Sequence, residues 1–299
     1  MKTIGIIDLG SNSMRISVVC ISGNLHNTIF MDRRTVKLSE NMNTDMYLKT
    51  EAIERTVNAL EEYKKVFNEF GVERIVAVAT AAVRKAKNGG EFIKYVKERT
   101  GINIGIIDGK KEAEYDFFAI KYSMDINDCI IIDIGGGSTE IIGIRSGELE
   151  NYISVPFASR NITEMYLSPE NEQTILNAEK EILKIFKNID WLENFNGVPI
   201  VGLGGCLRAI GRADCTGKGI EYKSGYEMDL TSINAFYENI KKMSLPERIK
   251  VFGESKGDII LGGLIPFISL VDIVKPKHML VSDKGVKDGI IYAILKNMI

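Results

Sequence analysis

Carboxylates and glycines at a fixed spacing follow a strongly apolar segment in the middle of the chain. Residues 129–140 read CIIIDIGGGSTE, in which a buried-strand pattern runs into Asp133 and a triple glycine separates it from Glu140. A glycine turn leaves main-chain N–H groups bare, so that they can approach an oxyanion closely. Flanking carboxylates are the oxygen ligands that hold magnesium. The pattern predicts strand, tight turn and strand around a phosphate, although an ordinary hairpin with a capping aspartate shows the same pattern.

A second copy of this pattern lies at the start of the chain. Residues 4–16 read IGIIDLGSNSMRI, with Asp8 in the place of Asp133. The candidate metal ligands are therefore Asp133, Glu140 and Asp8. Two copies of one loop indicate an internal duplication, with one loop opening each half. The candidate phosphate-binding residues of the two loops are Gly10, Ser11, Asn12, Ser13, Gly135, Gly136, Gly137 and Ser138.

The duplicated loop is similar to those of the actin, hexokinase and Hsp70 architecture, in which two related domains hold phosphate in the cleft between them. Strand and helix patterns alternate in both halves, and no flexible linker interrupts them. We therefore expect an α/β protein of two ribonuclease H-like domains with mixed sheets and an interdomain cleft. The expected domains are residues 1–124 with the first loop and residues 125–299 with the second, the last helix packing back on the junction.

Composition and charge exclude several classes of protein. The chain has 45% apolar and 26% charged residues, as ordinary soluble globular proteins do. A net charge of −2 gives no general attraction to nucleic acid or anionic membranes, so we expect neither as a partner. No secretion signal is recognisable, and the four cysteines show no C-x-x-C spacing, so we expect buried, reduced thiols in a cytoplasmic protein. Only two histidines, isolated from each other, argue against histidine metal centres and Ser-His-Asp triads.

Four motifs, in this order, resemble the exopolyphosphatase and guanosine pentaphosphate phosphohydrolase (Ppx/GppA) family. They are DLGSNS at residues 8–13, TAAVR at 80–84, GKKEA at 109–113 and DIGGGSTE at 133–140. The likeness covers residues 1–145 well and continues more weakly to the C-terminus. It implies a short, two-domain enzyme that uses Mg²⁺, with a monovalent cation as a further option, to hydrolyse the terminal phosphoryl group of inorganic polyphosphate or of pppGpp. It also implies a homodimer.

The resemblance gives roles to individual residues. It implies that Glu112 activates the attacking water, that Arg84 contacts the phosphate, and that Asp133 and Glu140 lie on the magnesium side. Phosphoryl transfer needs a positioned water and stabilisation of charge on the equatorial oxygens, which N–H groups, an arginine and a metal supply. Without the resemblance, the sequence favours a position on a solvated helix face for Glu112 and a surface cation for Arg84. One departure from the family pattern lies beside Glu112, since Lys111 stands where a second acid is usual.

The leading hypothesis is an exopolyphosphatase, and a pppGpp 5′-phosphohydrolase is the alternative within the same enzyme class. A non-catalytic polyphosphate or nucleotide sensor is the alternative outside it. An ATP-dependent kinase on the same scaffold would need an adenosine site. Only a third glycine turn, at Gly204 and Gly205, favours such a site, and close packing of a helix on a strand explains that turn as well.

Overall fold

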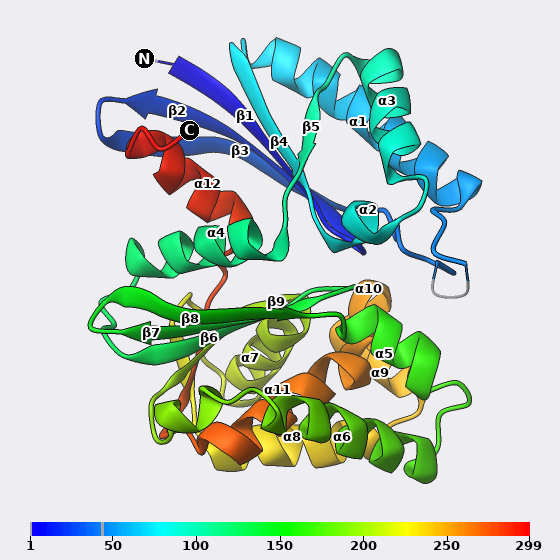
Figure 1. The fold of residues 1–299 in the computed structure, drawn as a ribbon, viewed down its shortest axis with the longest axis vertical. Helices are drawn as coiled ribbons and strands as arrows, with labels where there is room; N and C mark the ends of the chain where they lie inside the picture. The colour runs from blue at the N-terminus through cyan, green and yellow to red at the C-terminus, as the bar shows by residue number, and fades with distance from the viewer. Residues whose placement is uncertain (1, 43–44) are drawn as a thin grey trace. The chain divides into compact units, whose positions relative to one another are not determined.

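The computed structural model describes residues 2–42 and 45–299, and the chain divides into two compact units. The first unit contains the chain up to Ala119 together with Val286–Ile299, and the second contains Ile120–Gly285. The last helix, α12 (Val286–Leu295), therefore belongs to the first unit, where Figure 1 shows it in red beside the blue strands. The predicted division places all of residues 125–299 in the second domain and therefore differs from the observed one at residues 286–299.

The first unit is built on a five-stranded mixed sheet with the order β3-β2-β1-β4-β5. Strands β1 (Lys2–Leu9), β2 (Ser13–Ser22) and β3 (Leu25–Thr35) form an antiparallel meander. Strands β4 (Arg74–Ala79) and β5 (Ile104–Ile106) then add parallel to β1. The carboxyl ends of β1, β4 and β5 consequently lie at one edge of this sheet.

Helices cover both faces of this sheet. On one face, alternate β1 residues such as Ile7 and Leu9 pack with Leu60 of α1 (Thr50–Glu69) and Phe92 of α3 (Gly89–Thr100). On the other face, the remaining alternate residues, Ile4 and Ile6, pack with α12 and with α4 (Gly109–Lys121). The short helix α2 (Ala81–Lys85) directly follows β4. The period of two along β1 thus separates two cores, as a strand between two helical layers requires.

The second unit repeats the strand order of the first. Strands β6 (Cys129–Ile134), β7 (Thr139–Arg145) and β8 (Glu148–Val155) form a meander, and β9 (Ile200–Gly204) and β11 (Met279–Val281) add parallel to β6. A sixth strand, β10 (Tyr226–Met228), pairs antiparallel with β11. The prediction of an α/β protein with two mixed sheets is confirmed, and the shared strand order agrees with the duplication seen in the two loops.

The helices of the second unit bury a single large core against its sheet. They are α5 (Ser159–Tyr166), α6 (Glu172–Lys187), the 3-10 turn Leu192–Phe195, α7 (Gly205–Gly217), α8 (Leu230–Lys242), α9 (Leu245–Phe252), α10 (Glu254–Gly257) and α11 (Ile260–Val274). Helix α11 is buried over nearly its whole length. Within the described residues, no helix is long and apolar enough to cross a bilayer.

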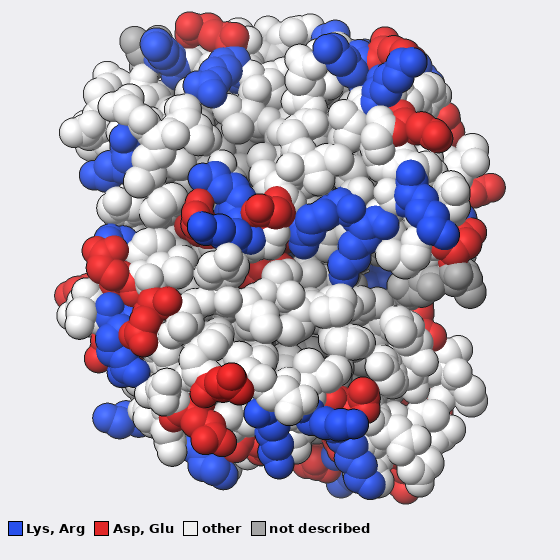
Figure 2. Space-filling model, in the orientation of Figure 1, with Lys and Arg blue, Asp and Glu red and all other residues white. Residues whose placement is uncertain are grey.

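Charges and thiols are distributed much as the composition suggests. Figure 2 shows basic and acidic side chains interspersed over the visible face, without a continuous field of one sign. None of the four cysteines forms a disulfide, and all except the partly exposed Cys20 are buried. Burial in an apolar strand raises the pKa of the Cys129 thiol to about 12, so this thiol stays protonated and unreactive.

Helices α4 and α12 pack backbone to backbone at Gly289, and this contact gives the first prediction. A Cβ at this position would lie 2.6 Å from the Tyr115 Cα and closer still to its carbonyl oxygen. Relieving this clash requires a shift of the backbone of one helix. Gly289→Ala should therefore lower the free energy of unfolding by about 2 kcal/mol or more, measured by denaturant titration. The control is Gly90→Ala in α3, where a Cβ meets nothing within 4 Å and stability should rise slightly. Equal stability of the two variants would contradict this packing.

Candidate phosphate site

Residues at the start of α5 donate hydrogen bonds to the glycine turn between β6 and β7. The carbonyl oxygen of Gly135 accepts from the Ser159 N–H at 3.2 Å and from its hydroxyl at 2.6 Å. The Gly136 carbonyl accepts from the N–H groups of Arg160 at 3.1 Å and Asn161 at 3.3 Å, and the Gly137 carbonyl accepts from the Asn161 Nδ2 at 3.3 Å. Every carbonyl of the triple glycine is therefore engaged on the α5 side.

The turn between β1 and β2 is anchored in the same manner by the segment that follows β3. The Asn12 carbonyl accepts from the N–H groups of Val36 at 3.0 Å and Lys37 at 2.9 Å. The Ser11 carbonyl accepts from the Ser39 N–H at 3.0 Å and from its hydroxyl at 3.3 Å. In both units, then, the residues after the third strand hold the carbonyls of the loop after the first strand.

This anchoring determines the direction in which the loop N–H groups point. A trans peptide is planar, so the N–H of one residue points opposite to the carbonyl of the residue before it. The carbonyls that face the anchoring segments thus turn the N–H groups of Gly136, Gly137 and Ser138 to the other side, together with those of Asn12 and Ser13. Successive N–H groups on one side of a turn form an anion-binding concavity. Five of the eight predicted phosphate-binding residues therefore have N–H groups in the arrangement that this role requires, and their role in binding stays a prediction.

The two loops share a backbone but differ in charge. A 3.1 Å hydrogen bond closes each turn, from the Gly10 N–H to the Ser13 carbonyl and from the Gly135 N–H to the Ser138 carbonyl. In the second unit, Asp133 lies directly across the β6–β7 pair from Glu140, whose Oε1 accepts from the Ser154 hydroxyl at 2.7 Å. Two carboxylates on neighbouring strands therefore share one face of the second sheet.

The corresponding position of the first unit holds a cation. Asp8 lies across from Arg15, and the Arg15 Nη1 donates to its Oδ2 at 2.8 Å. Arg33 follows in the same row on β3 and donates from its Nη2 to the Ser13 hydroxyl at 2.9 Å. With two arginines and one aspartate, this row carries a net charge of about +1 beside the first loop. Asp8 is committed to an arginine, and its metal role remains a prediction.

The predicted catalytic pair comes from the segments that follow β4 and β5. The Thr80 N–H donates to the Leu9 carbonyl at 3.1 Å, which ties the start of α2 to the end of β1. The Arg84 Nη1 then donates to the Ile107 carbonyl at 2.8 Å and to the Glu112 Oε2 at 3.0 Å. The Glu112 side chain is only 9% exposed and that of Arg84 21%. The alternatives of a solvated helix face and a surface cation are therefore wrong, and both groups lie at the sheet edge that carries the first loop.

The neighbouring Lys111, the departure from the family pattern, is engaged elsewhere. Its Nζ lies 3.0 Å from the Glu114 Oε2 and stacks over the Tyr115 ring, 5.0 Å from the centroid. The positive charge of Lys111 is thus partly neutralised within its own helix, and the Glu112 carboxylate keeps Arg84 as its ion-pair partner.

The third glycine turn follows β9 and lies against the second loop. Gly204 has a φ of +91°, which side chains other than glycine rarely adopt. A Cβ there would lie 2.9 Å from the Asp133 Oδ1 and closer to the Ile134 carbonyl. Close packing on β6 therefore accounts for this glycine, and the adenosine site that a kinase would need gains no support from it.

The metal site has a restricted set of ligands. Among residues 2–42 and 45–299, no three side chains of the His, Cys, Asp or Glu type come together as a metal-binding group. Magnesium commonly keeps several waters and takes one or two protein carboxylates plus substrate phosphates. The cross-strand pair of Asp133 and Glu140 fits that donor set.

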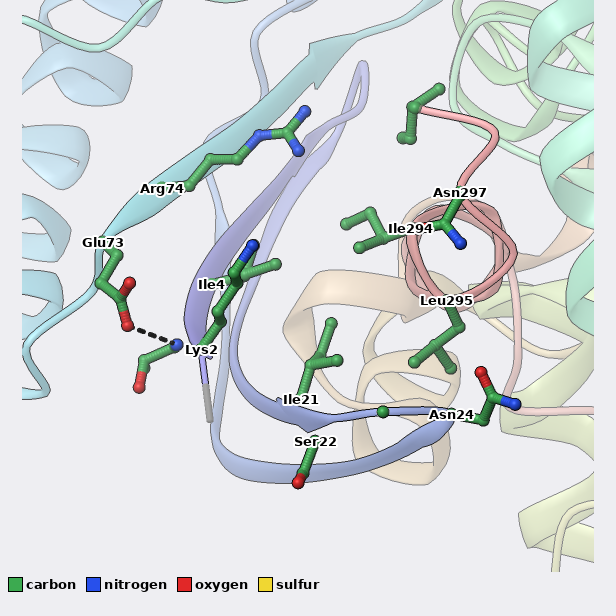
Figure 3. Close-up of a pocket in the computed structure, with 13 residues that line it drawn as sticks. Lys2, Ile4, Ile21, Ser22, Asn24, Glu73, Arg74, Ile294, Leu295 and Asn297 are labelled. Carbon is green, nitrogen blue, oxygen red and sulfur yellow. Dashed lines mark hydrogen bonds between the residues drawn. The ribbon is translucent and has the colours of Figure 1, made fainter.

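The described residues also form an open cavity of about 670 Å³ in the first unit, shown in Figure 3. Lys2, Arg74 and Ile294 are among the residues that line it. Because Lys2 begins β1 and the first loop follows Leu9, the cavity lies one strand length, roughly 23 Å, from that loop. It is therefore separate from the phosphate site.

Sequence reasoning did not identify several residues that build the loops. Arg15 and Arg33 were not singled out, although strand periodicity places Arg15 seven residues after Asp8 on the opposing strand of a hairpin, where it faces the aspartate. Asn161 was also missed. Its Oδ1 accepts from the Ala158 N–H at 2.7 Å and its Nδ2 donates to the Pro156 carbonyl at 2.6 Å, contacts that no local pattern reveals.

Comparison with known proteins agrees with this geometry. The model of the Ppx/GppA phosphatase family matches residues 17–298. A bifunctional 3-dehydroquinate synthase/phosphatase of Fusobacterium nucleatum is 31% identical over 98% of this chain, which spans only 46% of that relative. A putative exopolyphosphatase of Haemophilus influenzae is 26% identical over 99% of this chain and 93% of its own length.

Solved structures give the same result. The Aquifex aeolicus member of the Ppx/GppA family is 28% identical with a TM-score of 0.80, and 99% of this chain and 98% of that one are covered. An exopolyphosphatase of Cytophaga hutchinsonii has a TM-score of 0.91 at 21% identity, with the same coverage, and shows that the fold is shared. With a family model matched over nearly its whole length, this chain belongs to the Ppx/GppA phosphatase family.

Proposed function

We propose that the chain is an exopolyphosphatase, which hydrolyses the terminal phosphoryl group of inorganic polyphosphate and releases orthophosphate. The observation that carries the proposal is the pair of glycine turns in which the carbonyls of Ser11 and Asn12, and those of Gly135–Gly137, accept hydrogen bonds from the anchoring segments, so that the N–H groups on the opposite side can receive phosphate oxygens. Family membership gives the class of reaction, hydrolysis of a phosphoanhydride. The name of the Haemophilus influenzae relative supports polyphosphate as the substrate.

The partly buried ion pair of Glu112 and Arg84 supplies the acid–base chemistry. Water attacks the terminal phosphorus, its proton passes to the Glu112 carboxylate, and the bond to the bridging oxygen breaks with its electron pair leaving on the shortened chain. Arg84 holds the Glu112 Oε2 at 3.0 Å and is anchored on the Ile107 carbonyl, so both side chains are fixed before substrate arrives. A positioned base and cation lower the barrier without reorganisation during the reaction.

The rows of charged residues beside the loops serve the substrate. Arg15 and Arg33 add positive charge next to the first loop, where a polyanion needs it. Asp133 and Glu140 would hold Mg²⁺, which when bound supplies positive charge against the phosphate oxygens. Ser154 fixes the Glu140 carboxylate by its 2.7 Å hydrogen bond.

Glu112→Gln tests the role of the base. The amide keeps the size of the side chain but cannot accept the water proton, so phosphate release from long-chain polyphosphate with magnesium should fall by roughly two to four orders of magnitude while polyphosphate binding is kept. The assay is release of orthophosphate, with pppGpp and ATP as parallel substrates. The control is Glu114→Gln, two residues further along α4, where the carboxylate pairs with Lys111; this variant should retain activity.

The outcomes separate the competing functions. Preferred turnover of pppGpp by the wild type would replace polyphosphate as substrate but keep the hydrolase. Binding of polyphosphate without phosphate release from any of the three compounds would overturn the enzyme and leave a sensor. Full activity of the Glu112→Gln variant would remove Glu112 from the mechanism.

Glu140→Gln tests the proposed magnesium side. The amide oxygen can still accept from Ser154, but one negative charge is lost at the cross-strand pair. Because a magnesium ion depends on carboxylate charge, the Mg²⁺ concentration for half-maximal activity should rise about tenfold or more. Glu150→Gln on β8, with a side chain 46% exposed, is the matched control and should leave that concentration unchanged. An unchanged magnesium requirement in Glu140→Gln would rule out this ligand.

A further inference from the structure

The segment that anchors the first loop is itself held by one side chain of α1. The Arg55 Nε donates to the Val36 carbonyl at 2.6 Å, and its Nη2 donates to the Lys37 carbonyl at 3.3 Å and to the Glu40 Oε2 at 3.1 Å. One guanidinium thus engages two successive carbonyls and a carboxylate of the segment Val36–Glu40. A planar fork of donors suits such a multiple contact, whereas a lysine would make only part of it.

These bonds connect Arg55 to the loop through consecutive peptide groups. The Val36 carbonyl, which accepts from Arg55, belongs to the same peptide as the Lys37 N–H, which donates to the Asn12 carbonyl at 2.9 Å. The Asn12 carbonyl belongs in turn to the same peptide as the Ser13 N–H. A line of hydrogen bonds therefore runs from the guanidinium to the loop, and each bond polarises the next. The cation at its far end makes the Ser13 N–H a better donor to an anion.

Lys37, within this segment, has a backbone conformation that is unfavourable for a residue with a side chain. Its φ of +46° lies in the left-handed region, which is unfavourable for a residue with a Cβ. Bonds on both sides maintain it, because its N–H donates to Asn12 while its carbonyl accepts from Arg55 and from the Glu40 N–H at 3.0 Å. Such over-determined strain is a feature of sites where the backbone must be placed accurately.

We propose that Arg55 is a positioning residue for phosphate binding, which orients and polarises the first loop through the Val36–Lys37 peptide. The proposal rests on the proposed function, since it takes the loop to bind substrate phosphate. Arg55 contacts neither the loop nor its flanking carboxylate Asp8 in the bonds described, so its effect passes through the backbone. A loop of this kind binds polyphosphate in both the ground state and the transition state. Loss of the Arg55 side chain should therefore raise KM far more than it lowers kcat.

The test compares Arg55→Gln and Arg55→Lys with the wild type in two assays. The first is amide hydrogen exchange of the peptide covering residues 8–16, which should be roughly tenfold faster in Arg55→Gln because the anchors of the loop are loosened. The second is polyphosphate hydrolysis, where KM should rise about tenfold with kcat changed less than threefold, and Arg55→Lys should recover part of both effects. Arg34→Gln is the control. Arg34 lies on β3 and forms an ion pair with Glu62 of α1, and its side chain is 38% exposed, as is that of Arg55.

Each result has a definite meaning. Faster exchange and a raised KM in Arg55→Gln, with Arg34→Gln like the wild type, support the proposal. Unchanged exchange in Arg55→Gln, or the same changes in Arg34→Gln, would overturn it. If Arg55→Gln does not fold, Arg55→Lys decides by the same two measurements. If the wild type neither binds nor hydrolyses polyphosphate, the proposed function fails, and the exchange result still decides whether Arg55 orders the loop.

Discussion

The planarity of the peptide bond is the constraint on which both phosphate loops depend. A turn can present successive N–H groups to an oxyanion only if the carbonyls on the same peptides face elsewhere and find donors there. The chain meets this need twice with the residues that follow a third strand, Val36–Ser39 in one unit and Ser159–Asn161 in the other. The three-stranded meander brings those residues back to the loop, so the fold and the anion site have a common origin.

The duplication preserved this backbone while the side chains diverged. Equivalent rows across the first three strands read Asp8, Arg15 and Arg33 in one unit and Asp133, Glu140 and Ser154 in the other. The first row gains positive charge, and the second gains a second carboxylate in place of an arginine. In the proposed function the first row contacts the polyanion and the second holds the cation that accompanies it, a difference in charge that two identical loops would not provide.

Local signals in the sequence were sufficient for the strands, the turns and the two-unit α/β class. Alternating apolar residues and glycine turns depend on neighbours in the chain, and both loops were located from them. The burial of Glu112 was beyond such signals, because it depends on Arg84, 28 residues away, and on the carbonyl of Ile107. The sequence predicts that the last helix packs back on the junction but not that it belongs to the first unit, since an apolar helix face fits any apolar surface and only tertiary packing selects β1 and β2.

The energetic cost of the charged groups argues that they are kept for chemistry. Glu112, Asp8 and Glu140 are all buried, and moving a carboxylate out of water costs several kcal/mol that an ion pair only partly offsets. Apolar residues of similar volume would stabilise the same positions at least as well. Asp8 lies near the end of β1 and Glu140 near the start of β7, each next to a glycine turn, and Glu112 lies in the first turn of α4, whereas the strand interiors are apolar. A fold selected for stability alone would not concentrate its costliest groups beside the glycine turns and at the start of α4, and the phosphoryl chemistry proposed for these residues accounts for their position.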